Sequence, residues 1–321
     1  MSLRRKSFWL SILFTMLAIL LYYGYSFLTF STQVQTPSIV PTNPANNPEA
    51  SKPEIPIWGG TERVNILIMG VDRRELRPNE MPRSDSMMLV SIDPTSKTYT
   101  HFSILRDTYV EIPGYGKSRI NAALGQGGPE LAMETVSQFT GLPVSYYAIT
   151  DFEGFKGLID AVGGVEIFVE KNMRYRDPTD KGKYDINLKK GQQRLDGDKA
   201  LQYARFRHDA TSDYTRTERQ RKLLSALSQQ LKSGKTVLQL PSILQAIQPY
   251  IQTNLNTTDM LKLAALGLSL ESTASEGHQL PQAGAFHDAN RGGSVLIPSV
   301  EDVQKYVQDA LHDEPKTTSN M

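Results

Sequence analysis

The sequence predicts an α/β protein that is anchored to a membrane by one N-terminal helix. Three observations lead to this prediction: an uncharged, apolar run at 7–30, a proline-rich stretch at 31–60, and short β-branched runs that then alternate with segments of helical periodicity. Such alternation is typical of a sheet covered by helices. We therefore expect a cytoplasmic N-terminus at 1–6, a transmembrane anchor at 7–30, an extended linker at 31–60 and an extracytoplasmic domain at 61–321 with a helical C-terminal portion.

The apolar run from Ser7 to Phe30 is long enough to cross a bilayer as a helix, which takes about 20 residues. It is longer than the apolar region of a secretory signal, and no small-residue cleavage site follows it. Arg4, Arg5 and Lys6 precede the run, and basic residues favour the cytoplasmic side. We interpret the segment as a retained anchor with the domain outside the cytoplasm. Aromatic residues typical of the far membrane interface gather near its end: Tyr22, Tyr23, Tyr25, Phe27 and Phe30.

The composition excludes several classes of function. The chain has 321 residues and a net charge of +1, so no overall basic field favours nucleic acid. It has no cysteine, which excludes a disulfide framework, a thiolate zinc site and a cysteine nucleophile. The sequence contains no nucleic-acid-binding motif. The stretch at 31–60 carries six prolines among Asn, Thr and Ser, a composition that cannot bury enough apolar surface to fold.

Charged residues lie at the ends of three predicted strands. These strands and their charged ends are 64–69 with Asp72 and Arg73, 87–93 with Arg83 and Asp85, and 99–105 with Arg106 and Asp107. Because ligands of open α/β sheets bind beyond the carboxyl ends of strands, Asp72 is well placed for a site. The recurrence of acids and arginines at three strand ends makes these side chains candidates for one anionic-ligand site. Carboxylates with few other ligands suit Mg²⁺ or Mn²⁺, which usually keep waters and phosphate oxygens. The alternative is that Asp72 is an ordinary turn residue.

The rest of the chain is predicted to continue the alternation. Pro129 opens a helix and Gly141 ends it, as these residues do at helix termini. The predicted elements are helix 130–140, strand 144–150, helix 151–162, strand 165–169, a polar loop at 171–190 with a short strand at 184–188, helix 198–204 and helix 214–233. They continue with two helices within 236–270 that are broken near 254–256, a loop at 272–293 whose start could form a strand, a strand at 295–297 and a final helix to His312.

One stretch near residue 210 concentrates arginine side chains. Arg205 and Arg207 are two residues apart, so they point the same way on an extended segment. Asp213, Arg216 and Gln220 are spaced i, i+3 and i+7, so they share one face of a helix. Converging guanidinium groups suit phosphate oxygens, which they can bind bidentately. The alternative is a solvated, charged turn with local Arg–Asp pairs.

Several blocks of the chain resemble one family. They are Asn65–Arg73, Arg83–Leu89, Ser103–Thr108, IPGYG at Ile112–Gly116, INAA with GGPELA, FEGF with IDAVGGV, LDGDKALQYARFRHD, and the arginine-rich helix that follows. In these blocks, from about Asn65 to Leu231, the chain resembles the LytR-CpsA-Psr family. The order of anchor, linker and domain is similar as well.

The resemblance implies a three-layer α/β/α domain with a central mixed β-sheet. It implies a phosphotransferase that moves an anionic glycopolymer, of the teichoic acid or capsular type, from a polyprenyl-pyrophosphate lipid to peptidoglycan. The new bond would be a phosphodiester at a muramic acid hydroxyl. The implied cofactor is Mg²⁺ or Mn²⁺, and the implied partners are the lipid-linked glycopolymer, peptidoglycan and the membrane.

The resemblance also assigns roles to individual residues. Asp72 and Asp85 would bind the metal. Asp213 would deprotonate the acceptor hydroxyl or orient an arginine, with Arg106 and Arg207 also acting in catalysis. The residues that would hold the pyrophosphate are Arg83, Arg106, Arg205, Arg207, Arg216 and Gln220, with Arg73 and Arg219 in support. Such a set agrees with phosphoryl transfer, which depends mostly on positioning and on neutralising charge.

Two residues depart from the family pattern. Leu105 stands where the family has a proline before Arg106, and Thr215 stands where it has a glycine before Arg216. The first departure is expected to change only backbone rigidity. The bulk of Thr215 could crowd the pyrophosphate beside Arg216.

Two other functions use the same residues. One is a non-catalytic regulatory protein that binds polyprenyl pyrophosphate. The other is a pyrophosphatase that passes the phosphoryl group to water. The sequence leaves these alternatives open, because they differ from transfer only in the fate of the phosphoryl group.

Overall fold

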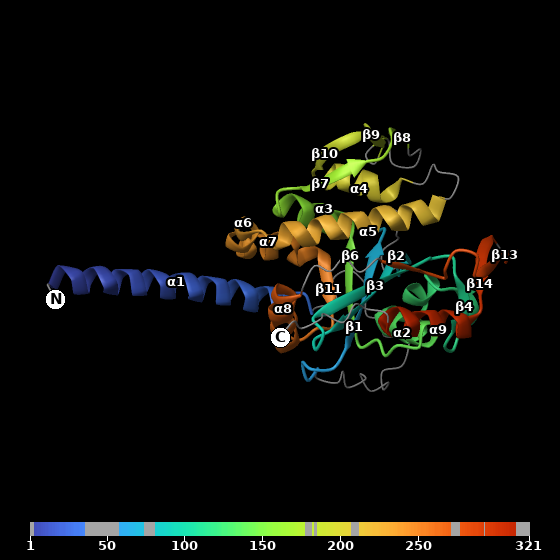
Figure 1. The fold of residues 1–321 in the computed structure, drawn as a ribbon, viewed down its shortest axis with the longest axis horizontal. Helices are drawn as coiled ribbons and strands as arrows, with labels where there is room; N and C mark the ends of the chain where they lie inside the picture. Colours follow the sequence, from blue (N-terminus) through green and yellow to red (C-terminus); the bar gives the residue numbers. More distant parts are fainter. Residues whose placement is uncertain are drawn as a thin grey trace, which may run out of the picture.

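The computed structural model of the chain describes residues 3–35, 58–73, 81–176, 182, 185–206, 212–270, 277–291 and 293–312. Figure 1 shows a long N-terminal helix that projects from a mixed α/β domain. This helix, α1, runs from Leu3 to Gln33. Among the described residues, its segment Ile12–Gln33 is the one long and apolar enough to cross a membrane, which agrees with the expected single anchor.

Six strands form the central sheet, in the order β11-β6-β1-β2-β3-β12. Their bounds are β1 Val64–Val71, β2 Ser84–Asp93, β3 Thr98–Ile104, β6 Tyr146–Asp151, β11 Ile251–Thr253 and β12 His278–Leu280. β1 pairs parallel to β6 and antiparallel to β2, and β3 pairs antiparallel to β2. The predicted mixed sheet is therefore confirmed. Because β1, β3 and β6 run in one direction, their carboxyl ends and the start of β2 lie along the same edge.

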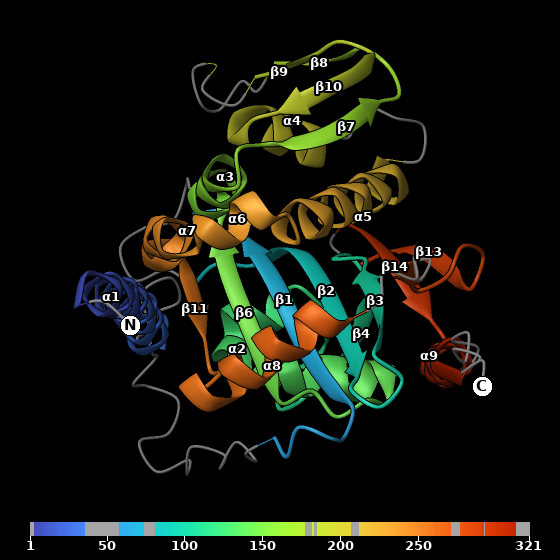
Figure 2. The same ribbon diagram turned by 60° about the vertical axis from the view of Figure 1, so that its left-hand side comes forward.

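The side chains of β1 alternate between two layers, as those of a strand buried on both faces do. Leu67 and Met69 lie in the main core, which packs the sheet against α2 and α9. Ile66 points to the opposite face and packs with Trp58 and Leu263, beneath α8. These helices are α2 (Ala122–Thr140), α8 (Thr257–Ser269) and α9 (Val300–His312). Figure 2 shows α2 and α8 on opposite faces of the sheet, so the three-layer prediction holds.

A second group of elements covers the sheet edge at which β1, β3 and β6 end (Figure 1). It has its own core, in which Ile159, Tyr203 and Leu227 are buried. Its elements are α3 (Phe152–Ala161), β7 (Val165–Val169), β8 (Met173–Tyr175), β9 (Ile186–Leu188), β10 (Gly191–Leu195), α4 (Gly197–Arg205), α5 (Ser212–Leu231), α6 (Gly234–Leu238), α7 (Leu240–Ile247) and the 3₁₀ turn Gln248–Tyr250. Two hairpins flank the sheet: β4 (Tyr109–Ile112) with β5 (Gly116–Arg119), and β13 (Phe286–Asn290) with β14 (Ser294–Pro298).

Several short elements differ from the prediction. α2 begins at Ala122 and is interrupted at Gly127 and Gly128, where Gly128 has a φ of 78° that favours glycine; Pro129 then restarts the helix. The strands β8, β11 and β13 lie in segments predicted to be loop or helix. These strands have only three to five residues each, so their own sequence pattern is too short to predict a strand. They form because a neighbouring strand is in place to pair with them.

The C-terminal end of α1 and the start of the domain also differ from the expected linker at 31–60. Helix α1 continues to Gln33, and its last turns dock on the domain: the backbone N–H of Thr253 donates to the Val34 carbonyl at 2.9 Å, and the Thr257 hydroxyl donates to Ser31 at 3.0 Å. Trp58 is buried and its backbone N–H donates to the Tyr146 hydroxyl at 3.2 Å. The packed residues at both ends therefore belong to the folded unit, and 36–57 lie outside the described residues.

Candidate active site

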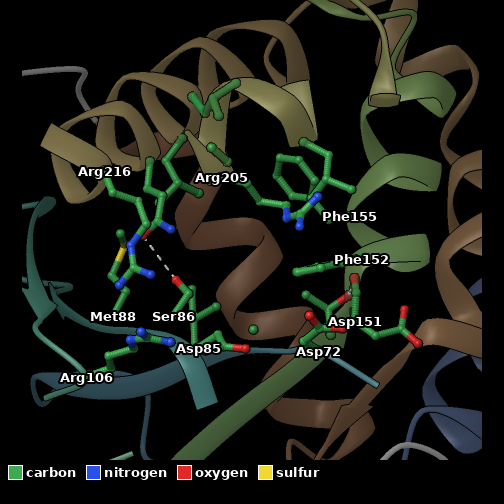
Figure 3. A pocket seen from close by; sticks show the side chains of 18 of the residues that line it. Asp72, Asp85, Ser86, Met88, Arg106, Asp151, Phe152, Phe155, Arg205 and Arg216 are labelled. Atoms are coloured by element: carbon green, nitrogen blue, oxygen red, sulfur yellow. Dashed lines mark hydrogen bonds and ion pairs between the residues drawn. The ribbon is translucent and has the colours of Figure 1, made fainter. Parts of the chain in front are cut away.

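A cavity of about 500 Å³ lies between the end of the central sheet and the second group of helices (Figure 3). One part of its lining is charged or polar, and the other is apolar. The polar lining residues are Asp72, Asp85, Ser86, Arg106, Thr150, Asp151, Arg205, Arg216 and Gln220. The apolar lining residues include Ile68, Met88, Phe152, Phe155, Leu201, Ala204, Leu223, Leu224 and Leu227. The cavity can therefore contact a ligand that has an anionic part and an apolar part.

Three carboxylates are supplied by neighbouring strand ends. Asp72 follows β1 directly, Asp85 is the second residue of β2, and Asp151 ends β6, where it is paired with Val71. In Figure 3, Asp72 and Asp151 lie together on one side of the cavity and Asp85 lies between them and Arg106. In the described part of the chain, no three acidic, His or Cys side chains lie close enough to hold a metal ion by themselves.

Arg106 is held by acidic side chains on two sides. Its Nη1 donates to Asp85 Oδ1 at 2.7 Å, and its Nε lies 3.5 Å from Asp107 Oδ2. Asp107 in turn lies 3.4 Å from the Nε of Arg119. The pairs fix the guanidinium at the cavity wall, just beyond β3. The preceding Leu105 is buried and its N–H donates to the Leu280 carbonyl at 2.8 Å, a bond that the family's proline could not make.

Helix α5 supplies both the polar and the apolar lining from one face. Arg216 and Gln220 are followed at helical spacing by Leu223, Leu224 and Leu227. The Ser86 hydroxyl donates to Gln220 Oε1 at 3.2 Å, which ties α5 to β2. Arg216 is buried and lines the cavity, with Thr215 directly before it on α5.

The end of α4 and the start of α3 meet on the other side of the cavity. The guanidinium carbon of Arg205 lies 5.2 Å from the ring centroid of Phe152, within the range of a cation–π contact. Asp151 caps α3, because its Oδ1 accepts a hydrogen bond from the Gly154 N–H at 2.9 Å. Arg73 Nη1 lies 3.9 Å from Asp151 Oδ2. These contacts set the position of Arg205 and of the α3 N-terminus at the cavity.

The structure brings together most, but not all, of the residues that the sequence placed in the site. The cavity wall contains the predicted Asp72, Asp85, Arg106, Arg205, Arg216 and Gln220. Arg83 is described and exposed, just before β2, and is not part of the cavity lining. Arg207 lies outside the described residues, as does the side chain of Asp213, whose backbone belongs to α5.

Arg219 points away from the cavity and serves the second core. It is 2% exposed; its Nε donates to Glu170 Oε1 at 2.7 Å and its Nη1 donates to the Phe206 carbonyl at 2.9 Å. The Tyr203 hydroxyl donates to the other Glu170 oxygen at 3.1 Å. Burial raises the pKa of Glu170, but hydrogen bonds from its own backbone N–H and from Arg219 outweigh burial and leave this pKa below its usual value. The expected support from Arg219 is therefore structural.

Sequence reasoning did not assign several lining residues to the site, among them Ser86, Asp151, Phe152 and Phe155. The two phenylalanines lie in a segment predicted only as the helix 151–162. The signal for Asp151 was its place at the end of a predicted strand and immediately before a helix, the same signal that singled out Asp72.

The fold and the cavity define a three-layer α/β protein with a pocket lined by both charged and apolar side chains. The profile of the LytR_cpsA_psr family matches residues 29–310, so the chain belongs to the LytR_cpsA_psr family.

Two family members of described function are similar to this chain over most of its length. The regulatory protein MsrR of Staphylococcus aureus (strain COL) is 33% identical over 257 residues, which are 78% of this chain and 75% of MsrR. The polyisoprenyl-teichoic acid–peptidoglycan teichoic acid transferase TagV of Bacillus subtilis (strain 168) is 36% identical over 261 residues, which are 79% of this chain and 66% of TagV.

Solved structures share the fold. The crystal structure of B. subtilis TagV has a TM-score of 0.65 at 30% identity and covers 79% of this chain and 99% of its own. The LytR-CPS2A-psr family protein YwtF (TagT) with bound octaprenyl pyrophosphate lipid has a TM-score of 0.57 at 26% identity, and the match covers 79% of this chain and 92% of that protein. YwtF is a Bacillus subtilis protein.

Proposed function

We propose that the chain is a membrane-anchored phosphotransferase that moves an anionic glycopolymer from a polyprenyl-pyrophosphate lipid to peptidoglycan. The observation that carries the proposal is the mixed lining of the cavity. Arg106, Arg205 and Arg216 line it together with the leucines Leu223 and Leu227. A diphosphate head matches the arginines, and a prenyl tail matches the apolar side chains. The transferase TagV and the octaprenyl-pyrophosphate complex of TagT support the same substrate class.

The arginines would bind the diphosphate by paired hydrogen bonds and neutralise its charge. Guanidinium groups remain protonated at all physiological pH values, so their charge does not depend on burial. Arg216 reaches the cavity from α5, Arg205 from α4 and Arg106 from the end of β3. A ligand between them is therefore held by three separate elements, which fixes its phosphorus atoms relative to the acceptor.

The donor set of the cavity fits a magnesium ion that shares its ligands with the substrate. Asp72 and Asp85 are hard oxygen donors on adjacent strands, and Mg²⁺ typically binds one or two carboxylates plus waters and phosphate oxygens. Asp85 Oδ1 accepts from Arg106, so the other oxygen of Asp85 is the one we assign to the metal. A bound ion would supply further neutralisation of the diphosphate leaving group.

The proposed reaction is a phosphoryl transfer. A peptidoglycan hydroxyl attacks the phosphorus that bears the glycopolymer, the bond from this phosphorus to the bridging oxygen breaks, and polyprenyl monophosphate leaves. The hydroxyl proton passes to a general base, a role for which Asp213 is the candidate on family resemblance. The arginines stabilise the charge that develops on the nonbridging and leaving oxygens.

The reaction requires the domain to stand on the side of the membrane where peptidoglycan is built. Basic residues before α1 favour an N-terminus in the cytoplasm, which would place the domain outside. Helix α1 would keep the enzyme at the membrane that holds its lipid substrate.

The test is a transfer assay with the full-length chain in lipid nanodiscs. A synthetic polyprenyl-pyrophosphate saccharide, Mg²⁺ and peptidoglycan oligomers are added, and the products are identified by mass spectrometry. A saccharide-phosphate adduct on the oligomer supports the transferase. Polyprenyl monophosphate with free saccharide phosphate and no adduct, using several oligomer acceptors, indicates a pyrophosphatase. A lipid that binds but stays intact indicates a regulatory binding protein; the relative MsrR is named a regulatory protein.

A further inference from the structure

The C-terminal half of α1 packs against α6 and α7 of the domain. The Tyr23 hydroxyl donates to the Leu238 carbonyl at 2.7 Å, and the Ser26 hydroxyl to the Pro241 carbonyl at 3.5 Å. Phe30 packs against the second core. Together with the contacts of Ser31 and Val34, these interactions fix the direction in which α1 leaves the domain.

The surface around this exit point exposes large apolar side chains. Leu238, at the end of α6, is 75% exposed, and Leu240, at the start of α7, is 38% exposed. Tyr22 and Tyr25 are exposed on the neighbouring turns of α1. Single exposed leucines are ordinary on a protein surface. These lie beside the point at which an apolar helix leaves the domain, and tyrosine is enriched at membrane interfaces.

The length of α1 allows an interface at this level. The uncharged part from Ser7 to Tyr22 measures about 24 Å at about 1.5 Å per residue. This is a few ångströms less than the roughly 30 Å hydrocarbon core of a typical bilayer. Local thinning of the bilayer and long flanking basic residues, here Arg4, Arg5 and Lys6, accommodate such a mismatch. An interface at Phe30, the predicted end of the span, would place the docked turns of α1 and the adjoining α7 within the hydrocarbon.

Helix α5 connects this surface to the cavity. Its lining face runs from Arg216 through Leu223 and Leu227, and Leu231 at its end is partly exposed, three residues before α6. From Arg216 to Leu231 the helix extends about 22 Å. Figure 1 shows that the C-terminal end of α5, with α6 and α7, lies on the side of the domain from which α1 extends. The leucine-lined part of the cavity therefore lies nearer this surface than Arg216 does.

We propose that this surface rests in the membrane interface. It consists of Tyr22, Tyr25, Leu231, Leu238 and Leu240. Its partner is the lipid bilayer, because the surface is continuous with the apolar helix that the bilayer must already hold. The domain then sits directly on the membrane with the apolar part of the cavity towards it, and a polyprenyl chain enters along α5. This last consequence rests on the proposed function, whereas the contact surface itself does not.

The absence of cysteine from the chain permits a clean test. Leu238→Cys and Leu240→Cys are made one at a time in the full-length chain, labelled with an environment-sensitive fluorophore and reconstituted in phosphatidylglycerol–phosphatidylcholine vesicles. Val300→Cys, on α9, is the control, since Val300 is 39% exposed and Leu240 is 38% exposed. Figures 1 and 2 both place α9 away from α1. Circular dichroism confirms that each labelled variant is folded.

Quenching by nitroxide-labelled lipids should be several-fold stronger for the probes at Leu238 and Leu240 than at Val300, and quenching by aqueous iodide weaker. Equal iodide quenching at all three positions would overturn the proposal. So would probes at Leu238 and Leu240 that are shielded from both quenchers, because that pattern indicates a second protein copy on the surface.

The quenching experiment uses no glycopolymer, so it succeeds or fails independently of the proposed function. A Leu238→Glu/Leu240→Glu double variant then tests the route of the lipid. We expect transfer from a membrane-embedded long-chain substrate to fall at least tenfold, while transfer from a detergent-dispersed short-chain substrate stays within twofold of the native rate. Equal losses with both substrates would overturn the proposed route, and no transfer by the native chain would refute the proposed function alone.

Discussion

The Ser86 hydroxyl donates a hydrogen bond to Gln220 Oε1 at 3.2 Å and so joins the start of β2 to α5, 134 residues further along the chain. Ser86 is the neighbour of Asp85, and Gln220 lies one helical turn after Arg216. The bond therefore sets the distance between a sheet that supplies carboxylates and a helix that supplies an arginine.

Replacing Ser86 tests this link. Ser86→Ala removes the donor, and we expect the free energy of unfolding to fall by about 1 kcal/mol, the usual net contribution of one hydrogen bond. We also expect a higher KM for the lipid substrate, since α5 is less tightly held. Denaturation in detergent micelles and transfer kinetics measure the two effects. An unchanged KM would show that the bond does not position Arg216.

Arg106 and Arg63 form a matched pair for testing the charged end of the cavity. Both pair with an aspartate of β2, at 2.7 Å for Arg106 with Asp85 and 2.9 Å for Arg63 with Asp93, and their side chains are 26% and 25% exposed. Arg106→Ala should lower kcat/KM by about 10²–10³, the loss seen when one electrostatic donor is removed from an active site. Arg63→Ala should leave kcat/KM within about twofold. Similar losses for both variants would indicate a structural effect.

Asp72→Asn tests the proposed metal ligand. The amide keeps the shape of the side chain but loses the charge that a magnesium ion needs, so the Mg²⁺ concentration for half-maximal transfer should rise at least tenfold. Binding of Mn²⁺, followed by electron paramagnetic resonance in the presence of the lipid, should weaken in parallel. Asp93→Asn is the control at the other end of β2. Unchanged Mn²⁺ binding in the Asp72 variant would exclude this residue from the metal site.

The Arg219–Glu170 pair should matter for stability rather than for catalysis. Breaking a buried ion pair from one side costs about 3–5 kcal/mol, and partial exposure of Glu170 should keep the loss near the lower end. Arg219→Ala should therefore lower the midpoint of thermal unfolding markedly. The fraction that remains folded should retain the native kcat. A folded variant with strongly reduced kcat would return Arg219 to the catalytic set.

The lowered pKa of His101 predicts how the free energy of unfolding depends on pH. Burial, the charge of Arg221 and His278 together lower its pKa from 6.5 to about 4 in the folded chain. Between pH 6.5 and about 4, His101 is therefore protonated in the unfolded chain but neutral in the folded chain. The free energy of unfolding consequently falls as the pH drops through this range. The loss from this group amounts to about 3 kcal/mol at most.

His101→Gln should remove this loss above pH 4.5. Glu170 affects stability in a lower pH range than His101. Its pKa in the folded chain lies below 4.5, so the stabilisation that it provides is lost only as the pH falls below that value. Chemical denaturation of native and variant chains between pH 4.5 and 7.5 checks the difference. Parallel pH profiles would mean that His101 is not the titrating group.

The sequence alone determined the anchor, the main strands and the residue types at their ends. Hydrophobic runs and their breakers are local signals, so β1, β2 and β3 could be predicted from their own residues. Pairing of these strands sets their directions. It brings Asp72, Asp85 and Arg106 to one edge of the sheet, as expected. The family resemblance, confirmed by the match over 29–310, then indicated which chemistry these residues serve.

Only the tertiary structure decided which arginines face the cavity. Arg216 and Arg219 lie three residues apart on α5 and therefore only about 60° apart around its axis. Their spacing alone cannot predict that Arg216 faces the cavity beside β2 whereas Arg219 faces Glu170. Packing of α5 between the sheet edge and the second core makes that choice. The same holds for the end of α1, whose docking on α7 depends on contacts with residues more than 200 positions away. Local sequence patterns specify elements, whereas the rotation and placement of each element are set by the partners against which it packs.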